Sequence, residues 1–240
     1  MLICGFDLET TGLNTETDSI IEIGAVLWDT DLNTPMRIFS SLVYVPEGTV
    51  ISDEAASVNG ITREMLTLHG ISAWAAIKEV RNLIALSDYI VGHNIRSFDE
   101  PMLKQGFLRE HVAWINKPLI DTMTDLPFPK KIKGRTLIGL TAEHGFLNPF
   151  PHRAVTDVLA SLKLLSCYPL AEVLRIANSP FLYIAADVPF QRKDEAKKLG
   201  YRWHGNQRFW WKQIRDFQLA EEQLVATFVV NVLSNPVTDE

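Results

Sequence analysis

Cysteine is scarce in this 240-residue chain, with only Cys4 and Cys167 present. Two cysteines are too few for a disulfide framework or a cysteine-based zinc site. Long apolar runs are also missing, since no segment approaches the roughly 20 residues of a membrane span. The first residues lack the basic region and long apolar segment of a signal peptide. These absences predict a protein of a reduced, cytoplasmic compartment that has no membrane partner.

An excess of basic residues is missing too, because the formal net charge is -6. That value argues against a protein that coats nucleic acid. The charge is unevenly distributed, however, and residues 188–214 hold seven Lys and Arg against two acidic residues. Residues 128–135 form a shorter basic connector with two prolines nearby. Such local asymmetry says more about binding partners than the net charge does.

An apolar run at the start of the chain ends in two carboxylates. Residues 2–6 suit a short buried strand, and Asp7 and Glu9 follow with Leu8 between them. Residues two apart on a strand share a face, so the two carboxylates stand side by side while Leu8 faces the core. Like charges this close repel each other unless a cation lies between them. The pair therefore predicts a divalent metal site.

Strand and helix patterns alternate through the residues that follow. Two runs rich in apolar and β-branched residues, 19–28 and 38–45, predict strands that join the first in a sheet. Further elements are expected as strands at 89–92 and 119–122 and as helices at about 52–59, 61–68, 72–86, from 99, 136–143 and 154–168. This order predicts an α/β domain over residues 1–176, with a mixed central sheet flanked by helices. The role of Glu22, a charge inside the second run, is left open.

Three more residues stand out by their positions. Asp99 opens a predicted helix just after His93 and Asn94, Asp157 lies in the helix at 154–168, and His152 precedes that helix in a loop. Taken singly, they have ordinary alternatives as a helix cap, a first-turn acid and a surface histidine, and the strand-end pair as a solvated edge. These alternatives stay open on the positions of the residues alone. His93 is interpreted as a structural hydrogen-bonding residue.

Three ordered segments resemble the motifs of the DEDD superfamily of 3′–5′ exonucleases, the DnaQ-like or proofreading type. FDLETTGL (6–13) matches the first motif, GHNIRSFDEPML (92–103) resembles the second with Asp99 as its acid, and HRAVTDVLA (152–160) matches the third. The histidine of the third motif indicates the DEDDh branch. Residues 51–66 are similar to another recurring segment of that family. The second motif departs from the common form, because three residues rather than two separate Asn94 from Phe98. The resemblance covers about residues 1–168 and implies an RNase H-like fold.

The resemblance implies phosphodiester hydrolysis with two divalent ions, Mg²⁺ or Mn²⁺, about 4 Å apart. Such ions lower the pKa of water, neutralise the phosphate and stabilise the leaving 3′-oxygen, and they prefer oxygen ligands. By this resemblance Asp7 bridges both ions, and Glu9 and Asp157 complete the site of the nucleophile-generating ion. Asp99 is implied as a ligand acting directly or through water. His152 is the implied general base, since the histidine pKa lies near working pH.

The same resemblance implies where the substrate lies. Thr10, Thr11 and Leu13, just after the first motif, are expected to line the pocket of the terminal nucleotide, and Asn94 is a further candidate contact. The expected function is a metal-dependent 3′–5′ exonuclease that releases nucleoside 5′-monophosphates, with single-stranded DNA as its substrate and partner. Alternatives are an exonuclease of RNA or short oligonucleotides, and a nucleic-acid-binding or polymerase-associated module with a vestigial site. A homodimer and a replication or repair partner are left open.

A small aromatic-rich α+β module is expected at residues 180–240, with a strand at 181–184 and helices at 192–199 and 217–233. Residues 187–212 resemble a small domain of unknown function that is appended to nucleic-acid enzymes. Its predicted nucleic-acid contacts are Arg192, Lys197, Trp203, Arg208, Trp210 and Trp211. Aromatic faces can stack on bases and cations can bind phosphates. The alternative is that the aromatic side chains form the module's own core, which so small a unit needs in order to fold.

Overall fold

The computed structural model describes residues 1–234 and residue 237 of the 240. The chain divides between Ala177 and Asn178 into two units. Within the described residues, no single helix is long and apolar enough to cross a membrane. One sharply bent pair, Ala154–Leu165 with Leu170–Ala177, meets that test by length and composition alone.

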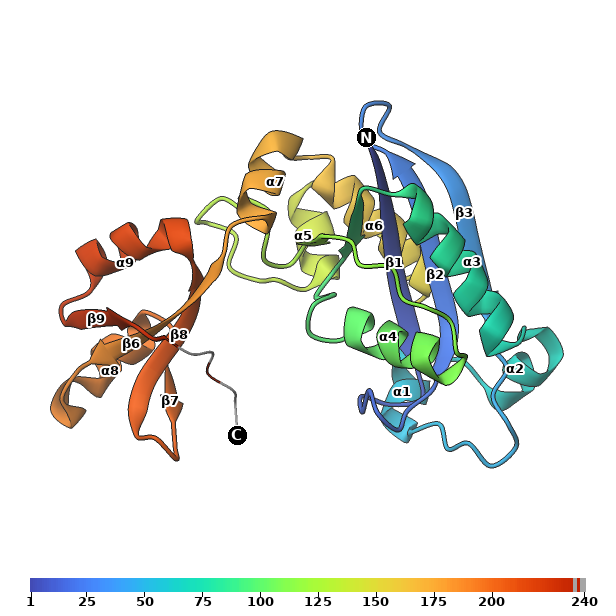
Figure 1. Ribbon diagram of the computed structural model, residues 1–240, viewed down its shortest axis with the longest axis horizontal. Coiled ribbons are helices and arrows are strands. Elements are labelled where there is room, and N and C mark those ends of the chain that lie inside the picture. The colour runs from blue at the N-terminus through green and yellow to red at the C-terminus, as the bar shows by residue number, and fades with distance from the viewer. Residues whose placement is uncertain (235–236, 238–240) are drawn as a thin grey trace. The chain divides into compact units, whose positions relative to one another are not determined.

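The first unit is built on a five-stranded sheet in the order β3-β2-β1-β4-β5 (Figure 1). Its strands are β1 (Leu2–Thr10), β2 (Ile20–Asp29), β3 (Thr34–Leu42), β4 (Tyr89–Gly92) and β5 (Leu119–Asp121). β1, β2 and β3 pair antiparallel, whereas β4 and β5 run parallel to β1. The predicted mixed sheet is therefore confirmed. β3 begins and ends earlier than the predicted 38–45, and Val43 leaves the ladder to form an isolated bridge with Ile71.

Seven helices surround this sheet among the described residues. They are α1 (Asp53–Asn59), α2 (Arg63–His69), α3 (Ala73–Leu86), α4 (Asp99–Arg109), α5 (Leu137–Glu143), α6 (Ala154–Leu165) and α7 (Leu170–Ala177). Four of them begin at a Ser or Thr whose hydroxyl accepts a hydrogen bond from the backbone three residues on: Ser52, Thr62, Ser72 and Thr136. These caps satisfy amide groups that a helix leaves unpaired at its start. The sequence analysis did not predict α7.

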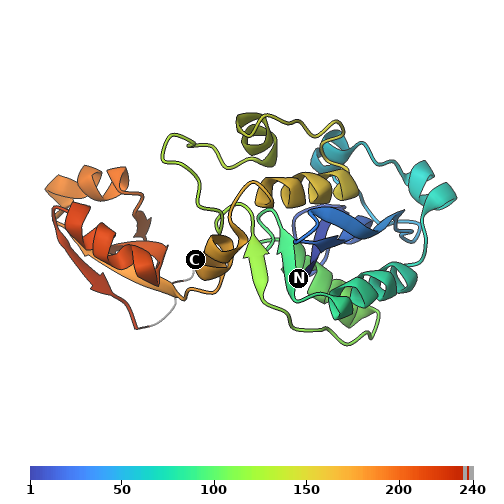
Figure 2. The same cartoon turned by 90° about the horizontal axis from the view of Figure 1, so that it is seen from above.

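The sheet separates two apolar cores. Cys4, Phe6 and Leu8 of β1 pack against α3 and α4 on one face. Ile3 of β1 packs against a second cluster that includes Val158 of α6 on the other face. Figure 2 shows α6 on one side of the strands and α3 on the other. The alternation of side chains along β1 thus produces the three-layered α/β fold, and the predicted fold class is confirmed.

Two glycines let α6 approach the sheet closely. A Cβ atom on Gly5 of β1 would lie 2.8 Å from the Cγ1 of Val158, and one on Gly24 of β2 would lie 2.3 Å from the backbone nitrogen of Val155. Any larger residue would push the start of α6 away from the strands. Because Gly24 is the register partner of Asp7, these glycines set how near the α6 residues come to the carboxylates of β1.

The second unit has a four-stranded antiparallel sheet in the order β7-β8-β6-β9. Its elements are β6 (Phe181–Asp187), η1 (Phe190–Arg192), α8 (Lys193–Lys198), β7 (Arg202–His204), β8 (Phe209–Arg215), η2 (Asp216–Gln218), α9 (Leu219–Val225) and β9 (Val229–Val232). The core contains Ile184, Ala196, Tyr201, Trp210 and Ile214. One sheet with helices packed on an aromatic core gives the unit an α+β character.

The predicted helix at 217–233 is wrong. The helix α9 ends at Val225, and Val229–Val232 form β9, which pairs antiparallel with β6. Three of these four residues are valines, whose branched side chains favour strands. The pairing of β9 along the edge of β6 supplies backbone hydrogen bonds that the apolar spacing of the sequence does not reveal.

Candidate active site

The predicted acids meet where β1 and β4 end. Asp7 and Glu9 lie in the last four residues of β1, and Asp99 opens α4, which follows β4. Asp157 lies in the first turn of α6, and His152 lies just before that helix. All five residues line one cleft of about 640 Å³. The structure therefore brings together the full set of predicted catalytic residues.

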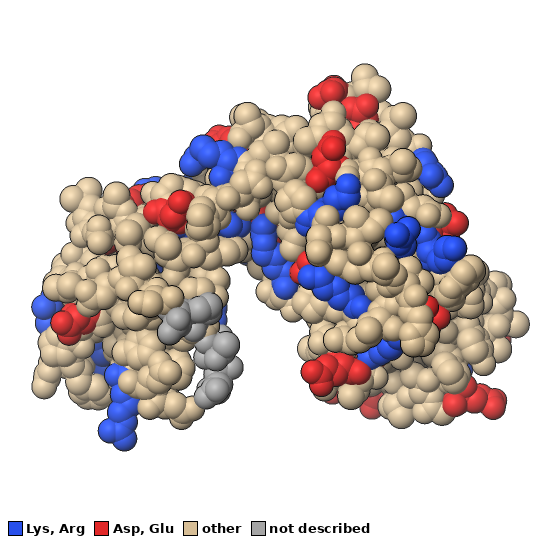
Figure 3. Space-filling model, viewed as in Figure 1, with Lys and Arg blue, Asp and Glu red and all other residues tan. Residues whose placement is uncertain are grey.

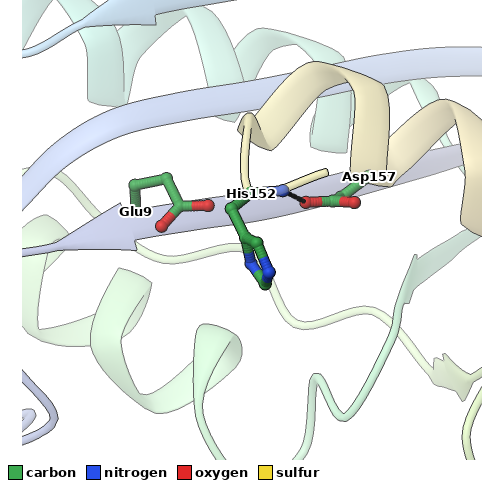
Figure 4. A group of neighbouring side chains, drawn as sticks. All are labelled: Glu9, His152 and Asp157. Atoms are coloured by element: carbon green, nitrogen blue, oxygen red, sulfur yellow. Dashed lines mark hydrogen bonds between the residues drawn. The ribbon is translucent and has the colours of Figure 1, made fainter. Parts of the chain in front are cut away.

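Glu9, His152 and Asp157 form a close group in this cleft (Figure 4). Each offers one ligand atom, and these atoms all lie within 4.8 Å of one another. Figure 4 shows Glu9 on the strand and the other two at the start of α6. Carboxylate oxygens with an imidazole nitrogen at this separation form a donor set that a divalent cation can occupy.

The loop before α6 holds Asp157 in place. The backbone N–H of His152 donates to one Asp157 carboxylate oxygen at 2.9 Å, and the Asn148 amide donates to the other at 2.6 Å. His152 has a φ of 62°, in the left-handed region that non-glycine residues rarely adopt. Strained backbone of this kind concentrates at functional sites. The turn therefore orients the histidine side chain and the carboxylate together.

A buried ion pair attaches the same loop to the sheet. The Glu22 side chain is 2% exposed and accepts from Arg153 Nη2 at 2.8 Å and from the backbone of Ala154 at 3.1 Å. The Arg153 Nε also donates to Glu22 at 3.1 Å, so the guanidinium binds in a fork. Glu22, whose role the sequence left open, thus ties the start of α6 to β2.

Replacing Glu22 by Ala is expected to destabilise the unit by roughly 2–3 kcal/mol, because it leaves Arg153 and the Ala154 amide without their acceptor. The figure is below that for a fully buried pair, since the Arg153 side chain is 41% exposed. Urea unfolding measures the change, with the exposed Glu16→Ala as the matched control. Equal unfolding midpoints for the two variants would contradict this role.

The carboxylates of the cleft repel one another. Loss of hydration and the nearby charges of Asp99, Asp157 and Glu9 raise the pKa of Asp7 well above its usual range. Loss of hydration also raises the pKa of Asp157, although the hydrogen bonds from His152 and Asn148 act to lower it. Four carboxylates this close together destabilise the folded state unless a cation binds among them.

Burial acts in the same direction on the other two acids. It raises the pKa of Glu9 to about 8, although a hydrogen bond from the Asn59 side chain opposes the shift. It raises the pKa of Asp99 to about 7, although the backbone N–H of Leu8 donates to that carboxylate at 3.1 Å. This uncompensated cluster of oxygen donors fits divalent cations such as Mg²⁺ or Mn²⁺.

The second motif is fixed by two acids, Asp121 at the end of β5 and Asp125 just after it. Asn94 has a φ of 60°, and its backbone N–H donates to Asp121 at 2.9 Å. Arg96 pairs with the fully buried Asp125 at 2.6 Å, and its backbone N–H also contacts Asp121. Ile95 is completely buried. The three residues between Asn94 and Phe98 therefore form a pinned turn that absorbs the additional residue.

Residues 4–165 match the family model RNase_T, whose description is "Exonuclease". This chain belongs to the exonuclease family. The predicted DnaQ-like, DEDDh-type assignment is confirmed, and with it the class of enzyme.

The exonuclease is similar to DNA polymerases III of the PolC type over part of their length. It is 31% identical over 153 residues to the DNA polymerase III PolC-type of Pediococcus pentosaceus, covering 63% of this chain and 10% of that protein. The exonuclease chain thus spans about a tenth of the polymerase that it matches.

Two solved structures share the fold. Escherichia coli exonuclease I in complex with a dT13 oligonucleotide aligns with a TM-score of 0.66 at 12% identity, over 95% of this chain and 65% of that chain. The nuclease domain of 3′hExo, a DEDDh family member bound to rAMP, aligns with a TM-score of 0.57 at 19% identity, over 69% and 90% of the two chains.

A second, more apolar groove of about 570 Å³ adjoins the catalytic cleft of the exonuclease. The two share Leu8, Glu9, Leu13 and Phe98. Leu13, a predicted substrate contact, is 84% exposed beside both. Such a large apolar side chain held in solvent at a cleft is typical of a binding surface.

The other predicted substrate contacts differ in position. Thr10 lines the apolar groove, and Asn94 lines the catalytic cleft. Thr11 is 1% exposed, and its hydroxyl donates to Asp18 at 2.8 Å and accepts from the Ser19 backbone at 3.0 Å. Thr11 therefore shapes the turn after β1 from within.

Three site residues were not identified by sequence reasoning. They are Asn59, which hydrogen-bonds to Glu9, Asn148, which donates to Asp157, and Arg153, which pairs with Glu22. Asn59 is the last residue of the helix predicted at 52–59, and that prediction gives it no role in the site. Its place in the family-like segment 51–66 was the one available indication of a role.

The six residues predicted as nucleic-acid contacts in the second unit differ in burial and in their partners within the unit. Trp210 and Trp211 are 9% and 6% exposed, and Trp211 stacks on Tyr183, so both belong largely to the interior. Trp203 is 49% exposed. The aromatic run thus supplies much of the core that this small unit needs.

The predicted cations of the second unit are partly paired within it. Arg192 donates in a fork to Glu195, with both contacts at 2.7 Å, and Lys197 lies 3.7 Å from Asp194. Arg208 has a φ of 56° in the turn between β7 and β8. Contact of this unit with nucleic acid remains a prediction.

Proposed function

We propose that the exonuclease unit removes nucleotides one at a time from the 3′ ends of single-stranded DNA by metal-dependent hydrolysis, releasing nucleoside 5′-monophosphates. The observation that carries the proposal is the convergence of Asp7, Glu9, Asp99, Asp157 and His152 on one cleft. Those are the residues that the family resemblance requires, drawn from three separate elements and a loop.

The four carboxylates would hold two Mg²⁺ or Mn²⁺ ions. When bound, such ions lower the pKa of water, offset the charge of the phosphate and stabilise the leaving 3′-oxygen. The raised pKa values of Glu9 and Asp99 support this part of the proposal, because burial leaves these groups poorly hydrated and in need of a counter-charge.

His152 is the proposed general base. It is exposed at the cleft, and a ring nitrogen lies within 4.8 Å of carboxylate oxygens of Glu9 and Asp157. The imidazole takes the proton of the attacking water and passes it to solvent, to which its exposed ring has direct access. The hydrogen bond from the His152 backbone to Asp157 keeps the base next to the acids.

The apolar groove is the proposed binding site of the 3′-terminal nucleoside. Leu13, Val58 and Phe98 line it, and these apolar side chains suit the flat face of any base. The scissile phosphate then lies over Glu9, which lines both the groove and the cleft.

DNA is the preferred substrate in this proposal. This preference is supported by the similarity to a DNA polymerase and to an exonuclease solved with an oligo-dT strand. The alternative, an RNA or short-oligonucleotide exonuclease, is favoured by the likeness to a nuclease domain solved with rAMP. A vestigial, purely binding module is the other alternative.

A 3′-end degradation panel decides among these. Single- and double-stranded DNA and RNA of equal sequence carry a 5′ label, and the chain is assayed with Mg²⁺, Mn²⁺ or EDTA. We expect stepwise shortening of single-stranded DNA, free 5′-monophosphates as products, and no turnover in EDTA. Full activity in EDTA would contradict the metal site, faster RNA loss would favour the RNA alternative, and no turnover of any strand would favour the vestigial one.

Replacing His152 by Ala is expected to lower kcat by roughly 10²–10⁴-fold, the usual contribution of a general base. KM should change little, since the acids and the groove remain. Steady-state rates on a labelled DNA strand measure both constants. The control is His69→Ala, at the exposed end of α2. A purely binding role for His152 would instead raise KM and leave kcat unchanged.

A further inference from the structure

A basic loop between β5 and α5 takes no part in the chemistry above. Residues 126–136 of this loop contain no acidic residue and four cations: Lys130, Lys131, Lys133 and Arg135. The three lysines are exposed. Figure 3 shows Lys and Arg side chains gathered on this face of the exonuclease unit, around the loop that leads into α5. A chain of net charge -6 thus keeps a purely cationic segment here.

The loop is anchored rather than loose. Ile132, between the lysines, is 7% exposed and joins the core cluster of α5 and α6. The Arg135 guanidinium lies 4.6 Å above the Phe128 ring and donates to the Ile132 carbonyl at 2.8 Å. Lys130, Lys131 and Lys133 therefore extend from a fixed frame, and fewer degrees of freedom are lost when they bind a ligand.

The anchored loop directly contacts a residue of the catalytic cleft. The Arg135 carbonyl lies 2.7 Å from the Nε2 of His93, and His93 lines the cleft. Because a carbonyl only accepts, the Nε2 carries the proton, and the Nδ1 faces the Thr122 hydroxyl at 3.0 Å. The C-terminal end of the basic loop therefore contacts a residue that lines the cleft.

The geometry of the two cavities limits how a strand can leave. The apolar groove adjoins the cleft at Leu13 and Phe98, so a strand whose terminus fills the groove must leave past other lining residues. His152 and His93 line the cleft but not the groove. Residues 144–153, around His152, contain a single Lys or Arg, Arg153, whose guanidinium binds Glu22. His93 is contacted by the C-terminal end of the basic loop.

We propose that Lys130, Lys131 and Lys133 form a phosphate-binding track for the single strand upstream of the scissile bond, so that nucleic acid leaves the catalytic cleft past His93 and over this loop. The inference rests on the proposed function, because the position of the 3′ terminus sets the direction of the strand. Lysines supply point charges that bind successive phosphates without reading sequence.

The test replaces the three lysines together by Gln, which keeps Ile132, Arg135 and the His93 contact. On a labelled dT20 strand we expect KM to rise roughly tenfold or more in 50 mM salt, and kcat to be unchanged. Cleavage of the dinucleotide pTpT, too short to reach the loop, should be unchanged. In an Asp7→Asn background that leaves dT20 intact, the slope of log Kd against log salt should fall by about 2, near 0.7 for each lost contact.

Two matched variants make the result specific. Replacing the same three lysines by Arg keeps the charge and should restore wild-type KM. Replacing Lys78, Lys104 and Lys163 by Gln removes the same charge from exposed positions that line neither the cleft nor the groove, and KM should then change less than twofold. An unchanged KM and salt slope in the loop variant would overturn the proposal. So would an equal loss in this second variant, because it would show general attraction rather than a track.

These measurements distinguish a failure of the phosphate-binding track from a failure of the proposed function. If the wild-type chain degrades no strand, the function fails, and the anisotropy of labelled dT20 still reports whether the loop binds it. If the wild-type chain is an exonuclease and the loop variant matches it on dT20, only the track fails. A thermal unfolding midpoint equal to wild type shows that the loop variant is folded.

Discussion

Replacing Asp7 by Asn is expected to abolish strand degradation, with a fall in kcat of about a thousandfold or more. Asp7 is one of the carboxylates that would hold the cations, and without its charge the cleft would bind less well the ions that neutralise the attacking and the leaving oxygen. The amide keeps the shape of the side chain but removes its charge. Rates on a 5′-labelled single strand measure the loss in saturating Mg²⁺ or Mn²⁺.

The same substitution should make the metal-free protein more stable. The pKa of Asp7 is raised by lost hydration and by the charges of Asp99, Asp157 and Glu9, so its charged form opposes folding. The expected signature is a higher unfolding midpoint in EDTA at pH 8 together with lost activity. Asp31→Asn, in the exposed turn between β2 and β3, is the control and should leave both properties near wild type. Activity within tenfold of wild type would contradict the role of Asp7.

Local periodicity predicted the part of the site that lies on one element. The alternation of β1 places Leu8 in the core formed with α3 and α4, while Asp7 and Glu9 line the cleft. That relation follows from the two-residue period of a strand and needs no knowledge of the rest of the chain. The assembly of the four acids with His152 was predicted from the ordered motifs of a family.

Contacts between distant segments lay beyond the sequence. Glu22 and Arg153 are 131 residues apart, and nothing in either segment indicates that the two pair. The closeness of α6 to β2 depends on Gly24, where a Cβ would meet the Val155 nitrogen. A glycine within a strand signals a close approach but does not say which element approaches.

The second unit shows why composition alone misleads. A run of aromatic and basic residues is equally consistent with a stacking surface and with a small core. The pairing of Ala186 with Trp210 and of Ala185 with Trp211 places small side chains opposite large ones in the sheet. This complementary packing explains why Trp210 and Trp211 are buried while Trp203 is half exposed. Similarly, the pairing of β9 with β6 overrides the helical spacing of residues 217–233.

The cleft also predicts how stability depends on pH and metal. In the folded, metal-free state the pKa of Glu9 is about 8 and that of Asp99 about 7, against usual values near 4.5 and 3.8. Between about pH 5 and pH 8 the folded chain therefore binds more protons than the unfolded chain. Stability falls with rising pH wherever the folded state binds more protons. These two groups thus stabilise the fold at low pH and lose that contribution as the pH passes through 7 and 8.

A bound cation should reverse this trend, because it replaces the protons between the carboxylates. We expect the rise in thermal midpoint caused by Mn²⁺, relative to EDTA, to be small at pH 5 and to grow through pH 6, 7 and 8. Fluorescence-monitored unfolding in one buffer series measures it. A metal-induced rise that is the same at every pH would contradict proton–metal competition at this cleft.

The control must separate the carboxylates of the cleft from His93, which lines the same cleft. Burial lowers the pKa of His93, and such a group gives the opposite slope, since the unfolded chain then binds more protons. The double variant Glu9→Gln with Asp99→Asn removes the two acids and keeps His93. Its midpoint in EDTA should be flatter between pH 5 and pH 8 than that of the wild type, and Mn²⁺ should raise it little. If the unfolding midpoint of the double variant in EDTA fell with pH as steeply as that of the wild type, the pH dependence would have to come from other groups in the chain.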